Sequence, residues 1–194
     1  MTIPSGAIMA ASTANQLLLY PGGYPVYVDV PQRQVGGVGT ALRFALPLRA
    51  VNFPLSHARE SKLVVALAGE LTLRAGARTY AVLRAGQAAL VTPGTAHRIA
   101  QHGERPAVVG VALWPGAVEE AFRTLDRMVS QRGFEHAAVA ALFARYGVQW
   151  DAAITQHGHV RAPKVTAFRA ALRALPPALR ERLAACWREW LPPA

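Results

Sequence analysis

Residues 86–97 read GQAALVTPGTAH, and they join an apolar strand, a Pro-Gly turn and one histidine at fixed spacing. Gly86 and Gly94 permit turns that a side chain would block. The apolar run between them has the length and composition of a buried strand. The stretch therefore predicts a β-strand followed by a tight turn that holds the imidazole of His97 in a fixed place.

Short extended runs separated by Gly and Pro continue on both sides of this stretch. They begin at Gln16, and the clearest hairpin pairs residues 71–73 with residues 79–82. Apolar residues 107–113 supply a further strand, so the pattern favours an all-β barrel or sandwich. After Pro115 the apolar period changes from two to nearly four, which predicts helices over 118–129, 135–146, 161–175 and 177–191.

Residues 86–101 resemble the second sequence motif of the cupins, G-x5-P-x-G-x2-H-x3-N. The Gly94-x2-His97 half is intact, Pro93 stands one residue closer to Gly94 than the motif has it, and Gln101 occupies the asparagine position. In cupins the histidine of this motif points into a small β-barrel. The resemblance spans residues 40–113 and implies the double-stranded β-helix, or jelly-roll, barrel of that superfamily.

The first cupin motif, G-x5-H-x-H-x3,4-E-x6-G, is eroded in this chain. If it ends at Gly69, the second histidine is His57, Leu55 replaces the first histidine, and Lys62 or Ser61 replaces the glutamate. We therefore expect an all-β cupin core at residues 16–115, preceded by a flexible N-terminus at 1–15. An α-helical C-terminal extension at 116–194 is expected to pack on the barrel or on a partner subunit.

Metal-binding cupins use three histidines and one carboxylate to hold a divalent ion, and imidazole with carboxylate suits Fe, Mn, Ni, Zn or Cu. The resemblance carries over two of these ligands, His57 and His97. A stable site would need further ligands, and the candidates in the sequence are Glu60, Gln101, His102 and the pair His157 and His159.

The alternation of side chains along a strand favours an anion site, rather than a metal site, around His57. If residues 57–62 continue one strand, His57, Arg59 and Ser61 share one face, and Glu60 and Lys62 share the other. An inward Arg59 would repel a metal and attract a carboxylate, phosphate or enolate. We therefore predict a ligand-binding set for a small anion that consists of His57, Arg59, His97 and Gln101.

The net charge indicates that partners should be anionic, but it does not identify which kind of partner binds. The formal charge of +10 attracts anionic small molecules, nucleic acid and acidic proteins alike. The basic helices after residue 161 could meet such a partner, but an apolar stripe packed on the barrel or on a sister subunit is the more ordinary explanation. No helix-turn-helix or phosphate-binding glycine loop is visible, so nucleic acid is not expected as a partner.

The single cysteine, Cys186, excludes an intramolecular disulfide, and residues 1–15 contain no Lys, no Arg and no continuous apolar core. We therefore expect a cytoplasmic protein with no membrane partner. By resemblance to small bacterial cupins we also expect a homodimer.

Three function classes remain open at this point. The first is a small-molecule-binding cupin without metal, and the second is a metal-dependent cupin enzyme of the dioxygenase, isomerase or decarboxylase type. The third is a sensory or regulatory protein with a basic helical tail, because residues 69–71 and 93–97 resemble the sensory barrel of arabinose-type transcription regulators. The eroded first motif favours the first class.

Overall fold

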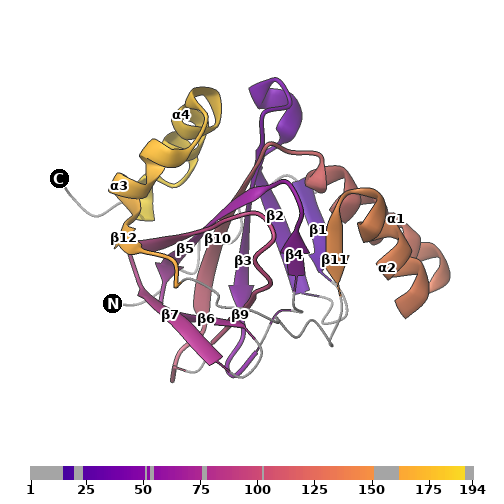
Figure 1. Ribbon diagram of the computed structural model, residues 1–194, viewed down its shortest axis with the longest axis horizontal. Helices are drawn as coiled ribbons and strands as arrows, with labels where there is room; N and C mark the ends of the chain where they lie inside the picture. The colour runs from indigo at the N-terminus through magenta and orange to yellow at the C-terminus, as the bar shows by residue number, and fades with distance from the viewer. Residues whose placement is uncertain are drawn as a thin grey trace.

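Three antiparallel sheets form the centre of the molecule in the computed structural model (Figure 1). The structure describes residues 15–19, 24–50, 52, 55–75, 78–101, 103–150 and 162–190. The larger sheet has seven strands, in the order β1 (Gln16–Leu19), β2 (Tyr24–Val30), β3 (Thr40–Leu46), β10 (Ala107–Trp114), β5 (Ser61–Ala68), β8 (Gln87–Val91) and β12 (Val165–Ala167).

The second sheet has three strands, and one bridge joins it to a separate two-stranded sheet. Its three central strands are β7 (Arg78–Arg84), β6 (Glu70–Ala75) and β9 (Arg98–Ala100). A separate pair consists of β4 (Leu55–His57) and β11 (Val148–Trp150). Backbone hydrogen bonds of 3.0 and 2.9 Å between Leu55 and His97 connect this pair to the start of β9. The bridge brings the remnants of the two sequence motifs side by side.

The larger sheet is buried on both faces, which explains its continuous apolar strands. On β5, Val64 and Ala66 belong to the core between the two sheets, whereas Leu63, Val65 and Leu67 belong to a second core on the outer face. The inner core also receives Phe122 and Leu125 from α1 (Val118–Arg132) and Phe143 from α2 (His136–Arg145).

The outer core lies beneath the last helices, which cover the opposite side of the large sheet from α1 and α2 (Figure 1). It includes Phe168 of α3 (Phe168–Ala171) and Leu172 of the 3-10 turn η3 (Leu172–Ala174). It also includes Leu179 and Leu183 of α4 (Pro177–Cys186), together with Trp187. The 3-10 turns η2 (Gln32–Val35) and η4 (Arg188–Trp190) complete the elements.

The fold class predicted from the sequence, an all-β core with an α-helical C-terminal extension, is confirmed. The predicted helices at 118–129, 135–146 and 177–191 correspond to α1, α2 and α4 with η4. The helix predicted over 161–175 is wrong at its start, because residues 165–167 pair with the edge of β8 before α3 begins. The extension also contributes β11, which was not predicted. Residues 1–14 of the predicted flexible N-terminus lie outside the described residues.

A cavity with a buried lysine inside the barrel

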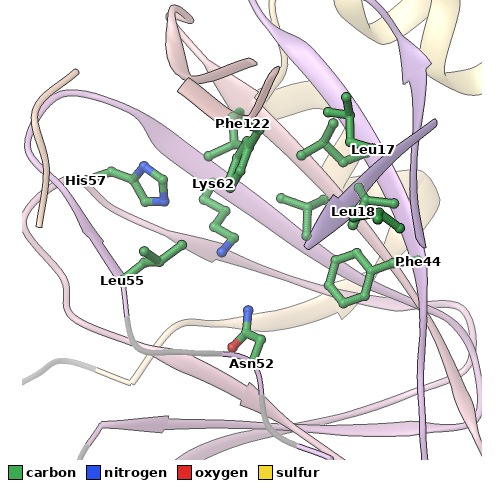
Figure 2. A pocket seen from close by; sticks show the side chains of 12 residues that line it. Leu17, Leu18, Phe44, Asn52, Leu55, His57, Lys62 and Phe122 are labelled. Carbon is green, nitrogen blue, oxygen red and sulfur yellow. The ribbon is translucent and has the colours of Figure 1, made fainter. Parts of the chain in front are cut away.

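A small cavity opens between β1, β3, β5 and α1 inside the barrel (Figure 2). Its volume is about 30 Å³, which is room for roughly two water molecules. Most of its walls are apolar, and its polar lining residues are Asn52, His57 and Lys62. Leu18 lines the cavity and is 36% exposed, so the cavity lies close to the surface there.

Lys62 enters the cavity because it is the second residue of β5 and lies on the inner face of that strand, together with Val64. Its side chain is 4% exposed, and its amine lies between His57 and Asn52 (Figure 2). No carboxylate of the described residues forms an ion pair with it. Burial lowers the pKa of the Lys62 ammonium to about 7, because the apolar walls disfavour the charged form.

Asn52 lies across the cavity from this amine, in the segment between β3 and β4. Its backbone N–H donates to the carbonyl of Ile99 at 2.9 Å, and its side-chain Oδ1 accepts from the N–H of Ile99 at 2.7 Å. Since the oxygen is occupied by that bond, the amide NH₂ is directed toward Lys62 (Figure 2). The cavity therefore holds two hydrogen-bond donors whose positions are fixed by the sheets.

His57 ends β4 and contributes the third polar group of the lining. It is 3% exposed, and neither ring nitrogen has a hydrogen-bond partner among the described residues. The nearest carboxylate oxygen, Oε2 of Glu60, lies 3.9 Å from Nδ1, which is too far for a hydrogen bond. Burial, together with the charge of Lys62, lowers the pKa of His57 to about 3, so the imidazole is neutral at pH 7.

His97 lies beside His57 but is not part of the cavity lining. The two ring centroids are 6.1 Å apart. Nδ1 of His97 lies 2.9 Å from the carbonyl oxygen of Thr95, which can only accept, so Nδ1 carries the proton. Burial lowers the pKa of His97 well below its usual range, and Nε2 is left as a buried lone pair without a partner in the described part of the chain.

The placement of Arg59 predicted from strand alternation is wrong. Residues Ala58 and Arg59 form a bend between β4 and β5, and both are exposed. The alternation restarts after the bend, so Glu60 and Lys62 are buried, with Lys62 beside His57, and Arg59 lies outside. Lys62 is therefore the cation that faces His57.

Gln101 also lies outside the cavity and has a structural role instead. Its Oε1 accepts from the N–H of Arg49 at 2.9 Å, and its Nε2 donates to the carbonyls of Gly103 at 3.0 Å and of Arg105. The side chain is fully buried. Of the four predicted ligand-binding residues, the structure places only His57 in the lining.

The donor set that the described residues place here does not fit a resident divalent metal. The lone pair on Nε2 of His97 and the ring nitrogens of His57, which have no partner among the described residues, would suit a metal ion. Lys62, however, places an amine where the cupin motif has a carboxylate. Burial raises the pKa of Glu60, which disfavours the carboxylate form that a metal needs. The described residues contain no cluster of three or more His, Cys, Asp or Glu side chains that could hold a metal ion. The other candidate ligands, His102, His157 and His159, lie outside the described residues.

Two residues of the cavity were missed by sequence reasoning. In the sequence, Lys62 stands out only because it replaces the glutamate of the first motif. That substitution is the signal that could have placed a lysine in the cavity. Asn52 carries no signal in the sequence, because its position depends on the backbone of Ile99 from β9, which lies 47 residues further along the chain.

Comparison with known proteins finds similarity at the level of solved structures. No family model and no curated protein matches the sequence. Similar solved structures include a predicted oxalate decarboxylase from Thermotoga maritima, 14% identical over 55% of this chain and 98% of that chain, with a TM-score of 0.46. An RmlC-like cupin from Shewanella frigidimarina is 15% identical over 57% and 95%, with a TM-score of 0.43. A Klebsiella pneumoniae protein with a double-stranded β-helix domain is 16% identical over 55% and 82%, with a TM-score of 0.41.

The antiparallel sheets, the bridge between the motif segments and the inward cavity define a double-stranded β-helix barrel. This barrel is the architecture that the second motif predicted. Within the described residues, no helix has both the length and the apolar character needed to cross a membrane.

Proposed function

We propose that this protein is a cupin that binds a small carboxylate in its barrel cavity, without a resident metal. The observation that carries the proposal is the Lys62 amine, which is buried in the cavity and has no carboxylate partner among the described residues. An ammonium in apolar surroundings is stable only when an anion compensates it. A ligand carboxylate would supply that charge and accept hydrogen bonds from the amide of Asn52 as well.

The cavity also limits the size of the group that binds. Its volume of about 30 Å³, room for roughly two water molecules, accommodates a small head group such as a carboxylate. The remainder of a ligand would extend along Leu18 toward the surface. His57 would contact the carboxylate edge, and the apolar lining of Leu55, Val111 and Leu113 would exclude water.

The test is calorimetric titration of the purified protein with formate and acetate, and with neutral acetamide as a shape control. We expect both carboxylates to bind and acetamide not to bind. In Lys62→Met the affinity should fall by about tenfold to a hundredfold, the usual contribution of a hydrogen bond to a charged group.

The matched control is Arg59→Met, which removes an exposed cation and should leave carboxylate affinity unchanged. Equal loss of affinity in both variants would indicate general electrostatic attraction and contradict a site in the cavity. Elemental analysis of the same preparation adds an independent check, since a stoichiometric metal lost in a His57→Ala, His97→Ala double variant would favour the metal-dependent enzyme class instead.

A further inference from the structure

The chain contains two lysines, and the fold places them in opposite environments. Lys164 is exposed, just before β12. Lys62 is buried and faces a cavity whose walls are mostly apolar. A lysine amine with no ion-pair partner among the described residues, in reach of a bound ligand, can act on that ligand as well as bind it.

The burial of Lys62 explains why its amine can react with a ligand. The apolar walls favour the uncharged amine, and at pH 7 a large fraction of Lys62 carries a nitrogen lone pair. A neutral amine is a nucleophile toward carbonyl carbon, and desolvation in an apolar pocket is a known way to activate a lysine. The amine of an exposed lysine is almost fully protonated at the same pH.

We infer that Lys62 forms an imine with a small ligand that carries both a carboxylate and an aldehyde or ketone, that is, a small oxo acid. The inference rests on the proposed carboxylate site and names its substrate class. Asn52 would hold the carboxylate while Nζ of Lys62 reaches the adjacent carbonyl carbon. An imine at this position becomes an electron sink for chemistry at the neighbouring carbon.

The step balances without an oxidant or reductant. The Nζ lone pair forms a C–N bond, and the carbonyl π pair moves to oxygen, which takes up a proton. Nitrogen releases its protons as the C–O bond breaks, and the oxygen leaves as water, so that amine and carbonyl give imine and water. The neutral imidazole of His57 is suited to donate a hydrogen bond to that oxygen, because it lines the cavity and its ring nitrogens have no partners in the described residues.

The experiment incubates the protein with glyoxylate and cyanoborohydride, which reduces an imine to a stable carboxymethyl amine. Mass spectrometry of the peptides then reports the labelling rate at each amine, with Lys164 as the internal reference. We expect Lys62 to be labelled at least about tenfold faster than Lys164, because burial lowers the pKa of the Lys62 ammonium. Acetate should slow labelling at Lys62 and leave Lys164 unaffected.

Two variants complete the test. Lys62→Met should abolish the fast labelling, and Lys164→Met should leave labelling at Lys62 unchanged. If Lys62 is labelled no faster than Lys164 while acetate still binds, the imine inference is wrong and the carboxylate site stands. If acetate neither binds nor protects and Lys62 is slow, both are wrong. Fast labelling that acetate does not slow would retain the imine and contradict carboxylate recognition.

Discussion

At the scale of single residues, the cavity concentrates polar groups that reduce the stability of the fold. Lys62, His57 and His97 are all buried, and His57 and His97 carry ring nitrogens without partners among the described residues. Each such group costs desolvation free energy that the fold does not recover. Groups of this kind are common where a protein binds or transforms a ligand, because the ligand supplies the missing partner.

Replacing Lys62 should therefore stabilise the protein that contains no ligand. Lys62→Met keeps the length of the side chain and removes the buried charge, so we expect the free energy of unfolding at pH 7 to rise by about 1–3 kcal/mol. Urea denaturation followed by circular dichroism measures the change. The control Lys164→Met, at an exposed site, should stay within about 0.5 kcal/mol of the original. A destabilised Lys62→Met would mean that Lys62 already has a compensating partner.

Because His57 and His97 are buried, we expect the free energy of unfolding to fall in acid. Their pKa values are lowered in the folded state, so below about pH 6.5 the unfolded chain binds protons that the native imidazoles refuse. The free energy of unfolding should fall as the pH drops from about 6.5 to 4, by up to about 1.4 kcal/mol per pH unit for each histidine.

Urea titrations across this pH range measure the slope. His57→Gln should reduce it by about half. A slope that is equally steep in His57→Gln would assign the acid lability to other groups.

At the scale of elements, α4 is attached to the large sheet by a polar cluster as well as by its apolar face. Asp29 of β2 accepts from Nε of Arg43 at 2.8 Å and from Nε1 of Trp187 at 2.7 Å. The Arg43 guanidinium also lies over the rings of Tyr27 and Trp190, at 5.2 and 5.1 Å. These contacts fix the register of α4 on the sheet.

Gly110 of β10 makes room for this attachment. A Cβ there would lie 2.7 and 2.8 Å from two ring atoms of Trp187, which is fully buried and cannot move aside. Gly110→Ala should therefore lower the free energy of unfolding by about 1–3 kcal/mol, through overpacking. Shrinking the neighbour should relieve the clash, so the double variant Gly110→Ala, Trp187→Leu should cost less than the sum of the single changes. Strict additivity in urea denaturation would contradict a direct clash.

At the scale of the whole molecule, one sheet separates two cores. Strands β5 and β10 contribute alternate residues to the barrel interior and to the core beneath α4. The extension adds β12 at the edge of the large sheet and β11 beside β4. Since the same strands support both cores, loss of either one exposes the other.

This shared sheet predicts a single cooperative unfolding transition. In a variant that keeps Trp187 as the only tryptophan, with Trp114, Trp150 and Trp190 changed to Phe, fluorescence reports α4 and circular dichroism reports the whole fold. We expect the two urea transitions to coincide. A fluorescence transition at lower urea would show that α4 detaches while the barrel remains folded.

The sequence alone determined the strand-rich barrel, the helices after Pro115 and the turn that precedes His97, because periodicity and Gly-Pro turns are local signals. Only the tertiary structure decided which polar groups meet. A bend at Ala58 and Arg59, too short to recognise in the pattern, moved Arg59 outside and put Lys62 beside His57. Asn52 reached the cavity through a backbone pairing with Ile99 that no local pattern encodes. A bend changes which residues of the following strand point inward. The side chains that line a cavity therefore depend on strand pairing between distant parts of the chain.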